Sequence, residues 1–337
     1  MSEARAASGP QAHVRWGIIG CGDVTEVKSG PAFGRLPNSS LVAVMRRDAA
    51  KAEDYAARHG VPRWTTDAEA IIAADDVDAV YVATPPSTHA HYTVRAAAAG
   101  KPVYVEKPMA TSLAEADAMV RACDAAGVPL FVAYYRRALP RFEYVRARLD
   151  EGAIGEPRLV QLELHQPPPP DPSEAGWRWD PDIAGGGLLM DVGSHGLDLL
   201  DHWFGPLDAV RAFGATRLSW SRVEDQVVAA LRFASGVQGV AVWGFNGTVR
   251  RDAITVLGSL GRLSVPLLAD GPVLLEDADG GVRRHHIAHP QHVQEPLIAS
   301  INAALTGAPE RCSSTGASAL RTQRVLEALL RDARSED

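Results

Sequence analysis

The sequence predicts an α/β protein in two parts: a doubly wound parallel sheet, then an α/β part with a large, mostly antiparallel open sheet. Three observations lead to this prediction. At 337 residues the chain is longer than one hydrophobic core usually grows. Its first third alternates short apolar runs with alanine-rich helical patterns, which indicates parallel strands covered by helices. After about residue 137 the strands lengthen and alternate in polarity, which is typical of antiparallel sheets.

The elements of the first part follow from these patterns. Buried strands are expected within residues 14–20, 41–46, 79–85, 102–108 and 129–135, with a minor strand at 62–65. Helices are expected within 49–60, 67–74, 88–100 and 112–127. Gly60, Gly100 and Gly127 stand where left-handed C-terminal caps are needed, and Ser112 with Glu115 fits a capping box. The alternation predicts a doubly wound sheet.

The second part is expected to consist mainly of hairpins. Strands are predicted within 158–166, 208–218, 226–245, 252–265 and 272–287, with turns at 234–236 and 278–281. Two helical patterns, 293–307 and 315–332, follow. The proline-rich segment 166–176 predicts a rigid loop inside this part rather than a linker between domains.

Composition limits the possible partners and the compartment. A net charge of -7 argues against general binding of nucleic acid, which needs a concentrated basic surface. No run approaches the roughly 18–20 apolar residues of a membrane span, and residues 1–13 lack the apolar core of a signal peptide. Cys21, Cys123 and Cys312 are scattered and odd in number, which favours free thiols in a reducing compartment. We therefore expect a cytoplasmic protein with a short disordered leader.

The first chemical motif is a glycine turn between a strand and a helix. Gly20 would allow the tight turn, and Gly22 would let the backbone approach a pyrophosphate held at the helix N-terminus. Asp23 and Val24 open that helix and join the expected cofactor site. Thr25 replaces the usual third glycine, which loosens the match. The motif predicts dinucleotide binding, and the alternative is an ordinary tight turn.

Two further segments end at the same carboxyl edge of the predicted sheet, where ligands bind in open parallel sheets. Thr84 and Pro85 would form a stiff loop beneath the nicotinamide half of a cofactor. His89 is expected either at the cofactor or simply in the first turn of the next helix. Glu106 and Lys107 end an apolar strand, and burying a charge is costly unless the charge is paired. We expect Lys107 to face the cleft, where it would donate a hydrogen bond to a substrate oxygen or shuttle a proton. The alternative is that Lys107 is simply a solvated residue at the end of the strand.

A helix in the second part carries the residue types needed for proton transfer. Three glycines, 185–187, precede it, and Asp191 and His195 are four residues apart and share one face, adjacent to Asp198. A carboxylate and an imidazole on one face suit acid–base chemistry near neutral pH. Together with His202 they could instead ligate a metal, but no second ligand cluster supports that reading, so no metal is expected.

These motifs together resemble the Gfo/Idh/MocA family of oxidoreductases. The resemblance rests on Gly20-x-Gly22, "TPPSTH" at 84–89, "EKP" at 106–108 and "GGGLLMDVGSHGLD" at 185–198, and it covers about residues 14–333. It implies an NAD(P)-binding Rossmann domain at 14–137 and a substrate-binding domain at 138–337, whose open sheet often mediates oligomerisation. A homodimer or homotetramer is therefore expected.

The resemblance also implies an activity and roles for single residues. The implied reaction is NAD(P)-dependent hydride transfer on sugars, cyclitols or related polyols, with Lys107 and His195 as acid–base groups and Asp191 beside them. Lys107 and Glu106 would also contact the cofactor. The walls of the substrate pocket would come from Tyr134, Arg136, Trp177 and Arg178. A non-catalytic regulator that senses the dinucleotide is the alternative function.

The choice of dinucleotide depends on the end of the second strand. NAD-binding strands usually end in an acidic residue about 20 positions after the glycines, where it binds the ribose 2′-hydroxyl. In this chain that place falls at Met45 or Arg46. The Arg46 guanidinium can pair with a 2′-phosphate, and Arg47 adds positive potential. We therefore expect NADP(H) to be favoured over NAD(H). In the alternative, Asp48 turns back to bind the ribose and selects NAD.

Overall fold

The computed structural model describes residues 13–334, so the predicted leader lies outside the described residues except for its last position. Within this range the first sheet has six parallel strands in the order β3-β2-β1-β4-β5-β6. The strands are β1 (Val14–Ile19), β2 (Ser39–Met45), β3 (Arg63–Thr65), β4 (Ala79–Val82), β5 (Val103–Val105) and β6 (Leu130–Val132). The chain reverses direction of winding between β1 and β4, which confirms the doubly wound prediction.

Helices cover both faces of this sheet because its strands are apolar on both sides. Trp16 of β1 packs with Phe33 on one face, while Ile19 of the same strand packs with Ile71 and Met119 on the other. The helices are α1 (Gly30–Arg35), α2 (Ala49–His59), α3 (Ala68–Ile72), α4 (His89–Ala98) and α5 (Leu113–Ala126). The carboxyl ends of the strands form one rim of the cleft described below.

The predicted helix ends are confirmed, with one difference. Gly60, Gly100 and Gly127 all have positive φ angles, of 64°, 72° and 65°. Ser112 Oγ accepts a hydrogen bond from the Glu115 backbone N–H at 3.3 Å, as in a capping box. The Glu115 carboxylate, however, accepts from the backbone N–H of Thr111 rather than from that of Ser112. The capping box is therefore only half formed.

The second sheet has eight strands within residues 13–334, in the order β14-β13-β12-β11-β7-β10-β9-β8. All neighbours pair antiparallel except β7 with β10, so the sheet is mostly antiparallel, as predicted. Its strands are β7 (Pro157–His165), β8 (Leu207–Ala215), β9 (Gln226–Phe233), β10 (Gln238–Gly244), β11 (Arg251–Gly258), β12 (Gly261–Val265), β13 (Val273–Asp277) and β14 (Val282–His285). The remaining helices are α6 (Pro140–Asp150), α7 (Pro181–Ala184), α8 (Ser194–Phe204), α9 (Glu295–Leu305) and α10 (Gly316–Arg334).

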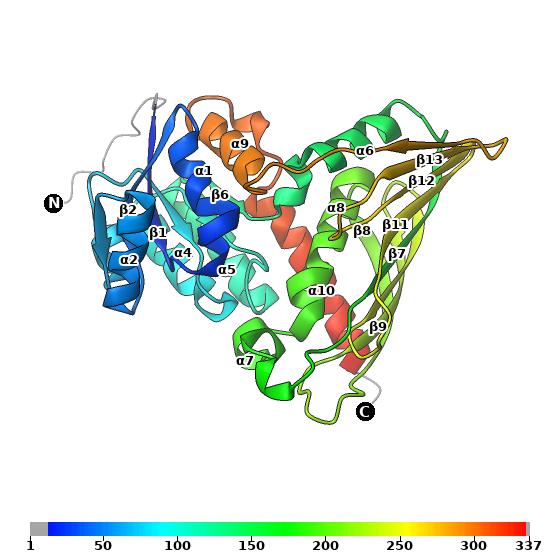
Figure 1. Ribbon diagram of the computed structural model, residues 1–337, viewed down its shortest axis with the longest axis horizontal. Coiled ribbons are helices and arrows are strands. Elements are labelled where there is room, and N and C mark those ends of the chain that lie inside the picture. The colour runs from blue at the N-terminus through cyan, green and yellow to red at the C-terminus, as the bar shows by residue number, and fades with distance from the viewer. Residues whose placement is uncertain (1–12, 335–337) are drawn as a thin grey trace.

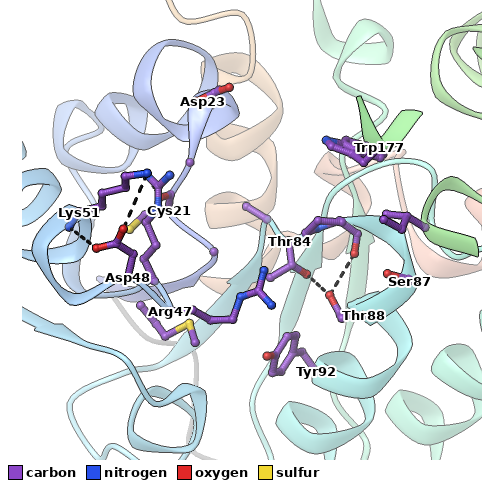
Figure 2. Close-up of a pocket in the computed structure, with 17 residues that line it drawn as sticks. Cys21, Asp23, Arg47, Asp48, Lys51, Thr84, Ser87, Thr88, Tyr92 and Trp177 are labelled. Carbon is purple, nitrogen blue, oxygen red and sulfur yellow. Dashed lines mark hydrogen bonds and ion pairs between the residues drawn. The ribbon is translucent and has the colours of Figure 1, made fainter. Parts of the chain in front are cut away.

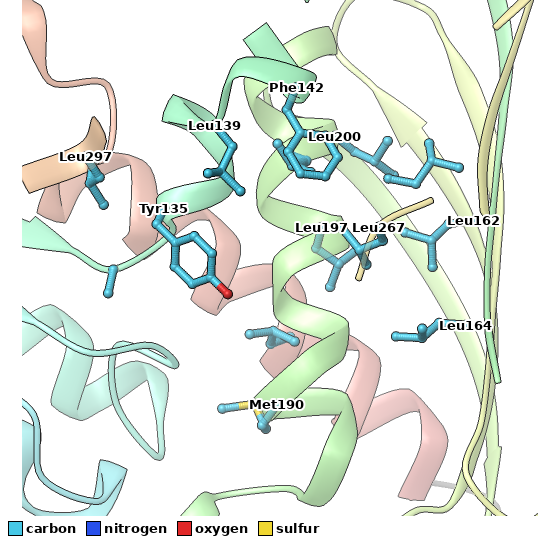
Figure 3. Packing of buried hydrophobic residues seen from close by; sticks show 14 of the residues in the cluster. Tyr135, Leu139, Phe142, Leu162, Leu164, Met190, Leu197, Leu200, Leu267 and Leu297 are labelled. Carbon is cyan, nitrogen blue, oxygen red and sulfur yellow. The ribbon is translucent and has the colours of Figure 1, made fainter. Parts of the chain in front are cut away.

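One face of the second sheet is covered and the other is not. Helices α6, α8 and α10 lie on the face toward the first sheet (Figure 1), and Leu197 of α8 packs with Leu162 of β7 in the shared core (Figure 3). On the outer face Phe213, Val228 and Val240 are 64%, 43% and 42% exposed. This outer face thus carries more apolar surface than solvent requires.

Late segments of the chain return to the first sheet. Helix α9 lies beside α1 (Figure 1), and Trp16 Nε1 of β1 donates to Asn302 Oδ1 of α9 at 3.0 Å. His292, just before α9, lies 2.8 Å from the Val27 carbonyl oxygen through its Nδ1. None of the helices formed by residues 13–334 combines the length and apolar character needed to cross a membrane.

Candidate active site

A long cleft runs along the carboxyl edge of the first sheet and continues toward α8. It consists of two adjoining cavities of about 640 and 630 Å³ that share Gly22, Thr84, Pro85 and Trp177. The first lies between β1, β2 and β4, and Figure 2 shows its residues. The second lies between the first sheet and the start of α8. A ligand of two connected halves can therefore lie along the sheet edge and present one end to α8.

The glycine turn is shaped as the sequence predicts. Gly20 has a φ of 94°, and a Cβ there would lie 2.7 Å from Thr84 Cγ2. A Cβ on Gly22 would meet nothing nearer than the Gly20 carbonyl oxygen at 3.9 Å, because this glycine faces the open cleft. Asp23 lines both cavities and Val24 the second. A ligand can thus approach the backbone closely at Gly22.

The helix after the turn begins differently from the prediction. Residues Thr25–Ser29 form a π-helical turn, η1, before α1 begins at Gly30. Thr25 Oγ1 donates to the Gly22 carbonyl oxygen at 2.8 Å, and the Thr25 carbonyl oxygen accepts from Tyr55 Oη at 3.1 Å. A side chain on Gly30 would collide with the Thr25 carbonyl oxygen and with Tyr55 Oη. Threonine at the third glycine position is therefore accommodated by its own hydrogen bonds.

The far end of the first cavity is predominantly basic. Arg46, Arg47 and Lys51 line it together with Asp48. Arg46 Nη1 donates to the Cys21 carbonyl oxygen at 3.1 Å, which holds this guanidinium against the glycine turn. Asp48 Oδ1 accepts from the Lys51 backbone N–H at 3.2 Å and so caps α2. Arg47 points across the cavity in Figure 2.

The loop after β4 forms the floor between the cavities, and His89 supports it from behind. Thr84 and Pro85 line both cavities. His89 is fully buried, with Nε2 2.8 Å from the Thr84 carbonyl oxygen and Nδ1 3.0 Å from that of Pro108. It lines neither cavity. Of the two placements considered for His89, the structure has the first-turn position, where the ring joins two loops of the cleft.

Lys107 and Asp191 meet in the second cavity. Lys107 Nζ donates to Asp191 Oδ1 at 2.5 Å and to the Asp191 carbonyl oxygen at 2.8 Å. The other carboxylate oxygen accepts from Arg178 Nε at 2.9 Å. Burial acts to raise the pKa of Asp191, but the charges of Lys107 and Arg178 outweigh it and lower the pKa below its usual value. Asp191 is therefore ionised and fixes the lysine ammonium in the cleft.

His195 lies beside this ion pair at the start of α8. Its side chain is almost fully buried and packs edge-on against Tyr135, with ring centroids 5.4 Å apart. Burial first, and then the positive charges of Arg136, Lys107 and Lys28, hold the pKa of His195 well below 6.5. Its Nδ1 is buried without a hydrogen-bond partner, so Nε2 is the nitrogen left to meet a ligand. Neutral His195 is a proton acceptor at physiological pH.

Glu106 belongs to a buried hydrogen-bond network at the edge of the cleft. Its Oε1 accepts from Tyr81 Oη at 2.6 Å and from Gln294 Nε2 at 2.7 Å. Gln294 Oε1 in turn accepts from Tyr104 Oη at 2.6 Å. Sequence reasoning missed Gln294, because it lies 188 positions from Glu106 and belongs to no local motif.

Three of the four residues predicted to form the pocket walls line the cleft, and one does not. Arg136, Trp177 and Arg178 line the second cavity, but Tyr134 is fully buried and lines neither; its neighbour Tyr135 faces the ligand space instead. The chain forms a short 3-10 turn, η3 (Tyr135–Ala138), directly after β6, so strand alternation does not predict which tyrosine faces inward. Lining residues that the sequence did not single out are Val27, Lys28, Lys51, Tyr92, Tyr135, Ile183, Val192, Leu268 and Gln294.

The remaining charged residues of α8 anchor the helix rather than line the cleft. Arg137 Nε and Nη2 donate to the two carboxylate oxygens of Asp198, both at 2.7 Å. Arg137 also reaches Asp201 at 3.2 Å, and Arg321 of α10 donates to Asp201. Within residues 13–334 no group of three or more His, Cys, Asp or Glu side chains could hold a metal ion.

Comparison with protein families assigns both halves of the chain. Residues 14–134 match the family model described as an oxidoreductase family with an NAD-binding Rossmann fold, and residues 142–264 match the GFO/IDH/MocA C-terminal domain. The chain belongs to the Gfo/Idh/MocA family. The first part is thus a Rossmann domain, and the protein is a member of an oxidoreductase family.

Individual proteins are similar to this one over most of the chain. Oxidoreductase P35 from Formosa agariphila is 40% identical over 86% of this chain and 89% of its own. A 1,5-anhydro-D-fructose reductase from Ensifer adhaerens is 30% identical over 87% and 88%. The crystal structure of a 3-ketoreductase from Actinomadura kijaniata, in complex with NADP and TDP-benzene, is 26% identical, with a TM-score of 0.82 and coverage of 94% and 97%.

Proposed function

We propose that this protein is an NAD(P)-dependent dehydrogenase or reductase that transfers a hydride between the nicotinamide and a carbinol or carbonyl carbon of a sugar, cyclitol or related polyol. The observation that carries the proposal is the meeting of Lys107, Asp191 and His195 in a cavity continuous with the glycine-turn groove. The family membership and the 1,5-anhydro-D-fructose reductase relative support this substrate class.

The residues of the groove fit a dinucleotide. The cleft is open at Gly22, where a side chain would project into the ligand space, and Thr84 and Pro85 border both cavities. Gly20, Gly22, Asp23 and Val24 would hold the pyrophosphate at the helix start. When bound, the cofactor supplies the nicotinamide carbon that accepts or donates the hydride.

The proton chemistry is assigned to two side chains. The Lys107 ammonium has three N–H donors, of which Asp191 engages two. The third can donate to the reacting substrate oxygen and stabilise negative charge on it. His195 Nε2 takes the hydroxyl proton during oxidation and returns it during reduction. Asp191 keeps Lys107 charged and in place, while Arg178 holds the other carboxylate oxygen.

Removal of either acid–base group tests this assignment. We expect Lys107→Ala and His195→Ala each to lower turnover by about 100-fold or more, the usual scale for a positioned acid–base group, while the cofactor still binds. Reduced cofactor is followed by absorbance with a panel of sugars and polyols. His286→Ala removes an exposed histidine outside both cavities and is the matched control. Near-normal turnover in either site variant would contradict the acid–base role of that residue.

The cofactor proposed is NADP(H) in preference to NAD(H). The support is the basic end of the groove, which Arg46, Arg47 and Lys51 line together with Asp48. Because Asp48 already caps α2, it is less available to a ribose hydroxyl. The domain division near residue 137, a cytoplasmic location and a lack of nucleic-acid or membrane partners remain our predictions.

We also propose that the protein is a homodimer or homotetramer formed through the outer face of the second sheet. The exposed side chains of Phe213, Val228 and Val240 support this, since Phe213 pairs across the strands with Val228. A regulator that binds the dinucleotide without turnover is the alternative function. It is disfavoured by the presence of both Lys107 and His195, and cofactor binding without turnover of any polyol in the panel would favour it.

A further inference from the structure

Charge in the second cavity is unevenly compensated. Its basic residues are Lys28, Lys107, Arg136 and Arg178, and its acidic residues are Asp23, Glu106 and Asp191. Asp191 serves both Lys107 and Arg178. Glu106 is engaged by the hydroxyl and amide donors of its network, and Asp23 lies where the two cavities join. Among residues 13–334 no carboxylate pairs with Arg136.

Arg136 is built into the cavity wall as a fixed cation. Its side chain is 8% exposed, and its Nη1 is buried without any hydrogen-bond acceptor. Its Nε donates to the Leu267 carbonyl oxygen at 2.9 Å, and its guanidinium lies 5.0 Å from the centre of the Tyr135 ring. A buried charge without an opposite charge beside it is costly. The Arg136 guanidinium is therefore held in place to bind an anion, because its planar set of N–H donors matches the oxygens of a carboxylate or phosphate.

Arg136 lies close to His195, so an anion bound by Arg136 would be part of the substrate molecule itself. The positive charges of Arg136 and Lys28 both lower the pKa of His195, and Arg136 lowers it more than any other charged neighbour. Tyr135 contacts both the His195 ring and the Arg136 guanidinium. A molecule whose reacting oxygen meets His195 thus brings its neighbouring groups to Arg136, with exposed Lys28 at the rim.

We propose that the substrate is an anionic sugar, with a carboxylate or phosphate held by Arg136 and assisted by Lys28. This inference rests on the proposed function and names the substrate class of the same site. Arg136 is then a specificity-determining residue that separates sugar acids and sugar phosphates from neutral polyols.

Binding to the cofactor-loaded protein tests the proposal without requiring turnover. The probes are matched pairs: glucose against glucuronate and gluconate, and glucose against glucose 6-phosphate. Their dissociation constants are measured by calorimetry. We expect at least one anion to bind about 10-fold or more tightly than its neutral partner, on the scale of a charge-assisted hydrogen bond. Comparing glucuronate and gluconate with glucose 6-phosphate shows whether the site binds a carboxylate or a phosphate. Equal or weaker binding of all the anions, or no binding by any of them, overturns the proposal.

Two variants assign the effect to Arg136. Arg136→Gln should weaken the preferred anion by about 10- to 100-fold and change its neutral partner by less than about 3-fold, whereas Arg136→Lys should restore part of the affinity. Arg324→Gln, an exposed arginine of α10 outside both cavities, is the control. Retained cofactor binding shows that each variant is folded. An equal loss for anion and neutral sugar contradicts the assignment. Failure of hydride transfer with preserved anion binding would reject the proposed function alone.

Discussion

The Arg137–Asp198 ion pair holds the helix that carries His195, and its removal should strongly destabilise the protein. The two side chains are only 3% and 1% exposed, and two hydrogen bonds of 2.7 Å join them. Asp198→Asn removes the negative charge and leaves Arg137 with Asp201, which Arg321 already engages. One buried carboxylate would then serve two guanidinium groups.

The magnitude follows from this burial. Breaking a buried ion pair by removing one partner costs about 3–5 kcal/mol, because the other charge stays buried without compensation. That is a large share of the roughly 5–15 kcal/mol by which most proteins are stable. A surface pair of the same length gives the contrast: Glu69 and Arg95 are 45% and 54% exposed and 2.7 Å apart. Glu69→Gln should cost less than about 1 kcal/mol.

Urea unfolding followed by tryptophan fluorescence measures both variants. We expect the free energy of unfolding to fall by about 3–5 kcal/mol in Asp198→Asn and by less than about 1 kcal/mol in Glu69→Gln. The double variant Arg137→Met with Asp198→Leu should recover most of the loss, because both charges are then absent. If Asp198→Asn costs no more than Glu69→Gln, the ion pair does not hold α8 in place.

Three further predictions concern the cofactor, the proton acceptor and the assembly. Arg46→Asp should weaken the binding of NADP(H) by about 10-fold or more, the scale of a charge-assisted hydrogen bond. A parent protein that prefers NAD(H), or a variant with unchanged affinity for NADP(H), would contradict this. Burial and positive neighbours hold the pKa of His195 well below 6.5, so His195 is already deprotonated at neutral pH. The kcat/KM for oxidation should therefore fall only as the pH drops through that lowered pKa, and a His195-dependent acid limb centred at or above pH 6.5 would reject this reasoning. Light scattering should give a multiple of 35.9 kDa for the parent protein, and Val240→Arg should shift it toward one chain; a single-chain mass for the parent at micromolar concentration would refute the oligomer.

Much of the fold was predictable because the local signals agree with one another. Apolar strands, helices of suitable length and capping glycines at positions 60, 100 and 127 all point to one doubly wound sheet. The meeting of Lys107 with Asp191 followed from the resemblance to the family rather than from the residues alone. Each residue stands at a marked position, one after a buried strand and the other after three glycines before a helix, but no local pattern relates the two.

What the sequence did not reveal depends on short irregular segments and distant contacts. The segment Leu189–Gly193, which carries Asp191, forms a π-helical turn, η6, before α8 begins, and no periodicity distinguishes five such residues from an ordinary helix. The choice between Tyr134 and Tyr135 depends on the turn that follows β6. The deep burial of His89 arises from carbonyl oxygens on two separate loops, which no local pattern of residues encodes.

The return of the late segments to the first sheet has a consequence for synthesis on the ribosome. Domains usually fold in order as the chain emerges, but the buried polar groups of Trp16, Tyr104 and Glu106 receive partners from Gln294 and Asn302. Residues 294 and 302 follow the whole second sheet in the chain, so these hydrogen bonds can form only after that sheet has been translated. We therefore expect a chain that stalls before residue 294 to leave these polar groups of the Rossmann domain without their late partners.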